Sequence, residues 1–195
     1  MKYRIDTLAG ALRKAAHYGY EGAFYAWESQ EGGYDACTDY NVTDVFTGRP
    51  VRTYFKDKQV HISAAVVYGI LRYVEWTGDD SLLDAEGVRT IVECAKFYYS
   101  LLLRRLTRED YEIHDVIGPD EYHERINNNG YTNRMAKYVL ENAVKVIETA
   151  MQRGTLPEEY DGQELKAKFV DAAEKLFLQR PHTGEKHENI IEQFD

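Results

Sequence analysis

Several features that identify large classes of protein are missing from this sequence. No apolar run approaches the ~18 residues that a membrane-spanning helix needs. The N-terminal residues MKYRIDTLAG lack the apolar stretch of a signal peptide. Lys and Arg form no long run, and the net charge of the chain is −9. We therefore predict neither a membrane partner nor a nucleic-acid partner, because both favour basic surfaces.

Cysteine is also scarce. The two cysteines, Cys37 and Cys94, stand far apart in the sequence and lack the spacing of a metal site. We interpret them as free thiols in a reducing compartment, and we expect a cytoplasmic protein. The histidines and carboxylates form no pattern that is typical of metal ligands, so we predict no metal and no cofactor.

Helical periodicity is the main pattern that the chain does contain. Hydrophobic residues make up 44% of the sequence, enough to bury a core. Apolar residues recur at helical spacing in five stretches. We predict an all-α fold in which residues 1–195 form one domain of sequentially paired helices with long, function-bearing loops. The expected helices are 4–18, 59–78, 79–106 with a break at Gly87, 131–153 with Thr132 or Asn133 as its N-cap, and 161–178.

A long irregular segment, residues 19–58, separates the first two expected helices. It contains Trp27 directly before Glu28. This pair suits a carbohydrate site, because a sugar can stack on an aromatic ring while its hydroxyls bond to a carboxylate. The alternative is a buried tryptophan beside a surface glutamate. His61, in the first turn of the next helix, either points into a cleft or has a structural role.

The stretch Asp115–Asn133, DVIGPDEYHERINNNGYTN, is a polar span with long helical patterns on both sides. Its rigid Gly-Pro turn can aim the adjacent Asp120 and Glu121 into a pocket. Asp120 is then held by hydrogen bonds, and Glu121 is available to protonate a leaving group as a general acid. The asparagine run suits either sugar hydroxyls or the fixing of the loop itself. The alternative is a solvated acidic turn before a helix that Asn129 or Asn133 caps.

Four segments of the chain resemble, in the same order, the central catalytic domain of the glycoside hydrolase family 65 disaccharide phosphorylases. This group contains maltose, trehalose, kojibiose and nigerose phosphorylases. The resemblance implies part of an (α/α)6 barrel, and an inverting reaction that gives β-glucose 1-phosphate and a free sugar. The segments are GYEGAFYAWES (19–29), QVHIS (59–63), DVIGPDEYHERINNNGYTN (115–133) and IIEQFD (190–195).

The resemblance also implies roles for individual residues. Glu121 matches the general acid, and Trp27, Glu28 and His61 match positions that line the sugar-binding cleft. Inorganic phosphate is then the co-substrate beside the disaccharide. Residues 47–58 match a variable loop near the acceptor subsite. Within them, RPVRTYF (49–55) most resembles the maltose-phosphorylase-like members, so we expect maltose or a related disaccharide as the substrate.

Members of that family are much longer than this chain. By the resemblance, we expect residues 1–195 to be an internal fragment of the barrel, without the N-terminal β-sandwich, the early barrel helices and the C-terminal part that holds the phosphate site. We expect this fragment alone to lack phosphorolytic activity, and to form homo-oligomers through uncovered apolar helix faces. Two alternatives stay open: an inverting, trehalase-like glycoside hydrolase of the same fold, and a catalytically silent sugar-binding helical domain.

Overall fold

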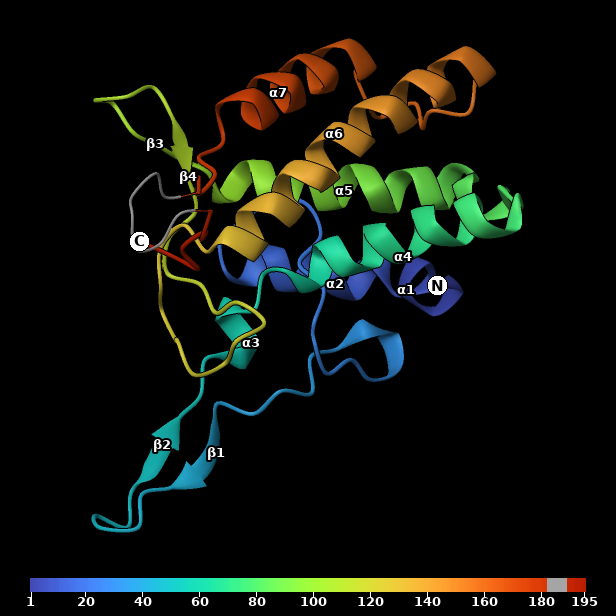
Figure 1. Ribbon diagram of the computed structural model, residues 1–195. Coiled ribbons are helices and arrows are strands. Elements are labelled where there is room, and N and C mark those ends of the chain that lie inside the picture. Colours follow the sequence, from blue (N-terminus) through green and yellow to red (C-terminus); the bar gives the residue numbers. More distant parts are fainter. Residues whose placement is uncertain (182–188) are drawn as a thin grey trace.

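Helix α5 (Ala85–Leu101) lies at the centre of the structure, a computed structural model that describes residues 1–181 and 189–195. It contacts α1 (Lys2–Asp6), α2 (Leu8–His17) and α4 (Ile62–Thr77) as well as α6 (Gly130–Arg153) and α7 (Gly162–Lys175). Figure 1 shows α6 and α7 above α5, and α1, α2 and α4 below it. The fold is therefore mostly helical, as the sequence predicts, and its core surrounds α5.

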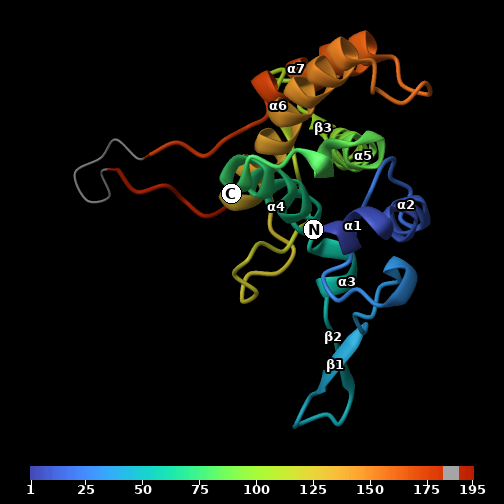
Figure 2. The same ribbon diagram turned by 90° about the vertical axis from the view of Figure 1, so that its right-hand side faces the viewer.

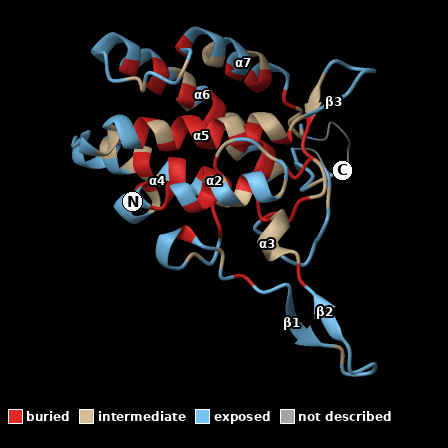
Figure 3. Cartoon of the chain, turned by 180° about the vertical axis from the view of Figure 1, so that it is seen from behind, coloured by how far each residue is buried: buried red, intermediate tan, exposed pale blue. Residues whose placement is uncertain are grey.

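The burial of α5 explains its central position. Residues 90–95 are all buried, so the helix is enclosed on nearly every side, and Figure 3 shows buried positions along most of its length. The helix begins after Asp84, whose side chain accepts a hydrogen bond from Gly87 N at 2.9 Å. The predicted break at Gly87 is therefore wrong. The interruption comes earlier, at Asp84, which separates α5 from the short 3-10 helix η2 (Ser81–Leu83).

Helices α6 and α7 form an antiparallel hairpin that covers one side of α5 (Figures 1 and 2). Helix α6 ends at Gly154 in the left-handed conformation, with φ of 67°, as the sequence predicts for a terminating glycine. Asp161 caps α7 by accepting hydrogen bonds from Gln163 N and Glu164 N, both at 3.0 Å. The expected helix 161–178 is correct, although it ends earlier, at Lys175.

The N-terminal part differs from the prediction in two places. The expected helix 4–18 is divided at Thr7 into α1 and α2, because Thr7 adopts a non-helical backbone conformation. The expected irregular segment 19–58 contains a 3-10 helix η1 (Glu31–Gly33), an antiparallel hairpin of β1 (Tyr40–Thr43) with β2 (Pro50–Arg52), and the short α3 (Phe55–Lys58). Figure 2 shows this hairpin projecting away from the helices.

Apolar side chains at the tip of the β1–β2 hairpin face solvent. Val45 is 87% exposed and Phe46 is 93% exposed, and Trp76 at the end of α4 is 77% exposed. Exposed apolar groups of this size are consistent with the predicted association into oligomers. The oligomeric state itself stays a prediction.

Within residues 1–181 and 189–195, no helix is long and apolar enough to cross a membrane.

The loops gather at one end of the helices. There, β3 (Leu103–Arg104) pairs with β4 (Tyr111–Glu112), and β4 leads into the polar stretch that precedes α6. Figure 1 places α3 and the C-terminal residues at the same end. Beyond β4, Val116 forms an isolated antiparallel bridge with Ile126. This end of the fold brings His61 and Glu121 near each other.

Candidate active site

The central polar stretch folds into a loop with a narrow neck. Val116 and Ile126 exchange both backbone hydrogen bonds at 3.0 Å, so the two ends of the loop are paired like a short hairpin. We call residues 117–125 between them the acid loop. Glu121 lies near its middle and is exposed to solvent. The acid that the sequence predicts is therefore accessible to a ligand.

Charged side chains hold the neck of the acid loop. Arg125 donates two hydrogen bonds to Asp115, from Nε at 2.8 Å and from Nη2 at 3.3 Å. Lys58 Nζ lies 2.8 Å from Oδ2 of the same carboxylate. These partners, first of all the hydrogen bond from Arg125, lower the pKa of Asp115 to about 2. Asp115 therefore stays ionised and connects both ends of the loop to α3.

The backbone at this neck is strained in a way that the ion pairs offset. Asp115 has φ of 59° and Arg125 has φ of 60°, in the left-handed region that non-glycine residues rarely occupy. Such conformations persist only where surrounding contacts fix them. The bidentate pair between these two residues is such a contact. The acid loop is consequently held at a defined angle rather than left as a free turn.

Asp120 and Glu121 have different surroundings, as the sequence predicts. Asp120 accepts hydrogen bonds from Tyr122 N at 3.1 Å, from Gln193 Nε2 at 3.1 Å and from His123 Nδ1 at 2.6 Å. These bonds, that from His123 first, lower the pKa of Asp120. Its carboxylate is thus committed to the structure of the loop, whereas Glu121 projects to solvent.

Gln59 and His61 are buried residues close to Glu121. Gln59 is only 3% exposed, and its Nε2 donates a hydrogen bond of 2.8 Å to Glu121 Oε1. His61 is buried at the N-terminus of α4 and packs edge-on against the ring of Tyr131 at 5.7 Å. The structure therefore brings His61 and Glu121 together across 60 positions of sequence. Gln59 is a site residue that the sequence analysis missed, although the QVHIS segment contains it.

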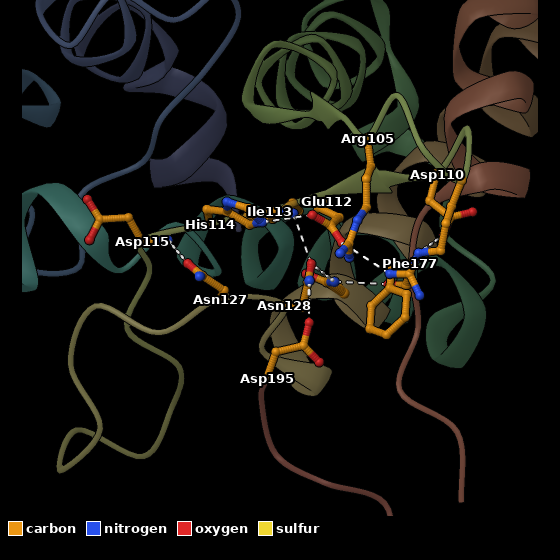
Figure 4. Close-up of polar contacts among 12 residues, drawn as sticks. Arg105, Asp110, Glu112, Ile113, His114, Asp115, Asn127, Asn128, Phe177 and Asp195 are labelled. Carbon is orange, nitrogen blue, oxygen red and sulfur yellow. Dashed lines mark hydrogen bonds and ion pairs between the residues drawn. The ribbon is translucent and has the colours of Figure 1, made fainter.

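Three asparagines fix the acid loop to its neighbours, which is one of the two roles that the sequence allows. Asn127 Oδ1 accepts from Asp115 N at 3.1 Å. Asn128, buried at the centre of Figure 4, accepts from Ile113 N at 3.3 Å and donates to Asp195 Oδ2 at 2.7 Å. The C-terminal residues therefore pack directly on the asparagine run.

The third asparagine, Asn129, caps helix α6. Its side chain accepts hydrogen bonds of 2.9 Å from both the backbone N–H and the hydroxyl of Thr132. The cap predicted at Thr132 or Asn133 is therefore wrong. Both residues are buried inside the helix, and Asn133 donates instead to Phe177 O at 2.9 Å. Asn129 therefore caps the helix, as the alternative interpretation of the sequence expects, and it also anchors the end of the loop segment that carries Glu121.

Trp27 and Glu28 lie on a separate segment that is anchored to α4. Ser63, in the first turn of α4, accepts from Tyr25 N at 3.0 Å and donates to Ala23 O at 2.9 Å. Trp27 is 45% exposed and meets Phe55 of α3 edge-on at 5.8 Å, so the alternative of a buried tryptophan is wrong. In the described parts of the chain, neither side chain bonds to the acid loop, and their predicted sugar contacts stay predictions.

A pocket of about 330 Å³ that opens to solvent lies between α4, α5 and α6. It is lined by Leu71, Val88 and Val146, among others, and includes neither Glu121 nor His61. It holds no acid-base pair suited to chemistry at a sugar. Within residues 1–181 and 189–195, no three His, Cys, Asp or Glu side chains cluster as a metal site would require. We therefore place the candidate site at the acid loop.

Burial of His61 has a consequence that can be measured. Loss of hydration lowers its pKa below the ordinary 6.5, and the backbone of Ile117 and the charge of Glu121 oppose this only in part. The unfolded chain therefore binds a proton at higher pH than the folded one. Stability that His61 contributes is present above pH ~6.5 and falls as the pH drops below it.

We expect urea unfolding of the wild-type chain to show this loss between about pH 6.5 and 5. In His61→Gln, the pH dependence over the same interval should be shallower. His17→Gln, at an exposed histidine of α2, is the matched control and should keep the wild-type slope. Equal slopes for wild type and His61→Gln would show that the burial of His61 has no such effect.

Comparisons with known proteins bear on the family. The family profile described as "Glycosyl hydrolase family 65 central catalytic domain" matches residues 1–195. Nigerose phosphorylase from Lachnoclostridium phytofermentans is 59% identical over 100% of this chain and 26% of its own length. Kojibiose phosphorylase from Halothermothrix orenii is 42% identical over 75% of this chain and 19% of its own. Maltose phosphorylase from Bacillus subtilis is 30% identical over 75% of this chain and 18% of its own.

A solved structure agrees on the fold. A putative kojibiose phosphorylase from the human microbiome superposes with a TM-score of 0.70 at 23% identity, covering 90% of this chain and 24% of that protein. The chain thus spans about a quarter or less of the length of these relatives. Its motifs, its helical fold and the match along residues 1–195 agree, and the chain belongs to glycosyl hydrolase family 65, within the central catalytic domain.

Proposed function

We propose that this chain supplies the general acid of an inverting α-glucoside phosphorylase, and that Glu121 is that acid. The observation that carries the proposal is the difference in surroundings between Asp120 and Glu121 in the acid loop. Asp120 is committed to three hydrogen bonds, whereas Glu121 is exposed at a loop that the Asp115–Arg125 pair holds in place. Relatives named nigerose, kojibiose and maltose phosphorylase support the reaction type.

In the proposed reaction, Glu121 protonates the oxygen that joins the two sugars. The bond from the anomeric carbon to this oxygen breaks, and its electron pair stays on the oxygen, which leaves as the hydroxyl of the free sugar. An oxygen of hydrogen phosphate attacks the anomeric carbon from the opposite face, so the configuration inverts. The products are β-glucose 1-phosphate and a free sugar. The Glu121 carboxylate then regains a proton from the phosphate ester or from water.

Nigerose is the substrate that we favour among the disaccharides. The resemblance of residues 49–55 to maltose-phosphorylase-like members predicts maltose or a related disaccharide. The relative named maltose phosphorylase is 30% identical to this chain, whereas the one named nigerose phosphorylase is 59% identical over all of it. These sugars differ in which hydroxyl of the second glucose carries the linkage. We therefore expect the acceptor side of the cleft to resemble that of a nigerose enzyme.

The reaction can be tested in the protein that the whole reading frame encodes. Nigerose, kojibiose and maltose are each incubated with and without inorganic phosphate, and the anomeric proton of the sugar phosphate is followed by NMR. We expect β-glucose 1-phosphate only when phosphate is present, and fastest formation from nigerose. Free glucose formed at equal rates without phosphate would instead identify the hydrolase alternative. Sugar binding without turnover would identify the silent domain.

Two further expectations belong to the same proposal. The helices of this chain form part of an (α/α)6 barrel, which the superposition on the kojibiose phosphorylase structure supports. The chain is cytoplasmic, which its two buried, unpaired cysteines suit. Phosphate acts as a co-substrate rather than as a cofactor, and homo-oligomers remain part of the expected assembly.

A further inference from the structure

Gln59 is the buried polar residue that the proposed chemistry has not used. Its side-chain amide donates to Glu121 Oε1 at 2.8 Å, and the residue is 3% exposed. Its own Oε1 is buried and has no hydrogen-bond partner among the residues that the structure describes. Buried polar atoms in folded proteins are usually hydrogen-bonded. The side chain of Gln59 is therefore oriented by its amide contact with Glu121, although this leaves its acceptor without a partner.

The backbone around Gln59 is fixed on both sides. Lys58 O accepts a hydrogen bond of 3.0 Å from Ile117 N, at the base of the acid loop. Val60 is 2% exposed, and its carbonyl accepts from the buried hydroxyl of Tyr98 at 2.7 Å. Hydrogen bonds therefore fix the backbone on both sides of Gln59, to the acid loop at Lys58 and to the core at Val60. The position from which the Gln59 side chain reaches Glu121 is fixed as well.

The contact has a chemical consequence for the carboxyl group. A protonated carboxyl has one carbonyl-type oxygen, which accepts, and one hydroxyl oxygen, which donates. The carbonyl-type oxygen is the better acceptor of the two, so the amide N–H of Gln59 favours Glu121 Oε1 as the carbonyl-type oxygen when the acid is protonated. The proton is thereby favoured on Oε2. Without Gln59, either oxygen can carry the proton and the carboxyl group can rotate.

We propose that Gln59 is a positioning residue that holds Glu121 with its acidic proton on Oε2, facing the bridging oxygen of the substrate. The inference rests on the proposed role of Glu121 as the general acid. Gln59 neither gives nor takes the proton, and the reaction itself proceeds as written above. Its effect is on the fraction of acid groups that are correctly aligned, and a misaligned catalytic group can lower the rate by roughly 100-fold.

Leaving-group dependence separates positioning of the acid from a general structural role. Gln59→Met keeps the length of the side chain but removes the amide. In the complete gene product, we expect kcat on the disaccharide to fall roughly 10- to 100-fold, with KM changed little. With α-glucosyl fluoride, whose fluoride leaves with little need for a proton, the rate should stay within about 3-fold of wild type. Equal losses on both substrates, or no loss on either, would overturn the proposal.

Two more variants complete the test. Gln59→Asn keeps the amide but shortens the side chain, so the amide can no longer reach Glu121 and the variant should show the same selective loss even if Gln59→Met does not fold. Gln152→Met, at an exposed glutamine in the last turn of α6, is the matched control and should behave as wild type on both substrates. If Glu121→Gln leaves the disaccharide reaction unchanged, the acid assignment fails. If only the Gln59 variants behave as wild type, the positioning role alone fails.

Discussion

Glu121→Gln is expected to lower kcat for phosphorolysis of the disaccharide by roughly 10²- to 10⁴-fold in the complete gene product. The amide has nearly the same shape as the carboxyl group, so it preserves the fold of the loop, but it cannot supply an acidic proton. The bridging oxygen would then have to leave as an alkoxide. The initial rate of sugar phosphate formation from nigerose measures the effect.

Glu124→Gln is the matched control for this experiment. Glu124 is an exposed glutamate in the same acid loop, three residues after Glu121, and it makes no hydrogen bond or ion pair among the described residues. Its replacement should leave the rate within about 2-fold of wild type. A loss as large as that of Glu121→Gln would mean that the charge of the loop matters and that no single acid exists.

Phe97→Ala is expected to destabilise the chain by about 3–5 kcal/mol, the usual cost of removing a fully buried aromatic ring. Phe97 is 0% exposed in the C-terminal half of α5. Its ring stacks on that of Phe24 at 4.7 Å with an interplanar angle of 14°, and the ring of Tyr20 meets it edge-on at 5.7 Å. The cavity left by alanine would have rigid walls on several sides, so little of it could close.

Urea unfolding followed by circular dichroism measures this loss as a lower midpoint. Phe46→Ala is the matched control, because Phe46 is 93% exposed at the hairpin tip and should cost less than about 0.5 kcal/mol. Phe24 leads into the segment that carries Trp27, so Phe97→Ala should also loosen that segment. Faster hydrogen exchange at residues 23–28 would show it, whereas unchanged midpoints would place Phe97 outside the core.

The sequence predicted the helices well where their cores are periodic. The helix that became α6 repeats its apolar positions over many turns, and its glycine terminator lies where expected. Its N-cap was misplaced because Asn129, Thr132 and Asn133 all have side chains that can cap a helix. Asn129 is the residue that caps the helix, and its side-chain amide also donates a hydrogen bond of 3.3 Å to Gln193 O. Local sequence contains no information about that distant partner.

The β1–β2 hairpin shows a different limit. Its residues are exposed on both faces, so no alternation of apolar and polar side chains marks the strands.

The break before α5 was misplaced for a third reason. Gly87 looks like a helix breaker, but a side chain there would collide with Leu82 O, which is 1.7 Å from the position of an added Cβ. Glycine is present because the preceding turn packs on the helix.

The sequence by itself determined the helical class, the family and the identity of the candidate acid, because these depend on periodicity and on residues adjacent in the chain. Only the tertiary structure decided how the acid is held. Glu121 meets Gln59 from 62 positions away, and the asparagine run meets Asp195 from 67 positions away. Such pairs form when α5 and its neighbours bury their apolar faces and so bring distant loops to one end. Burial decides which polar groups meet, and no local pattern records it.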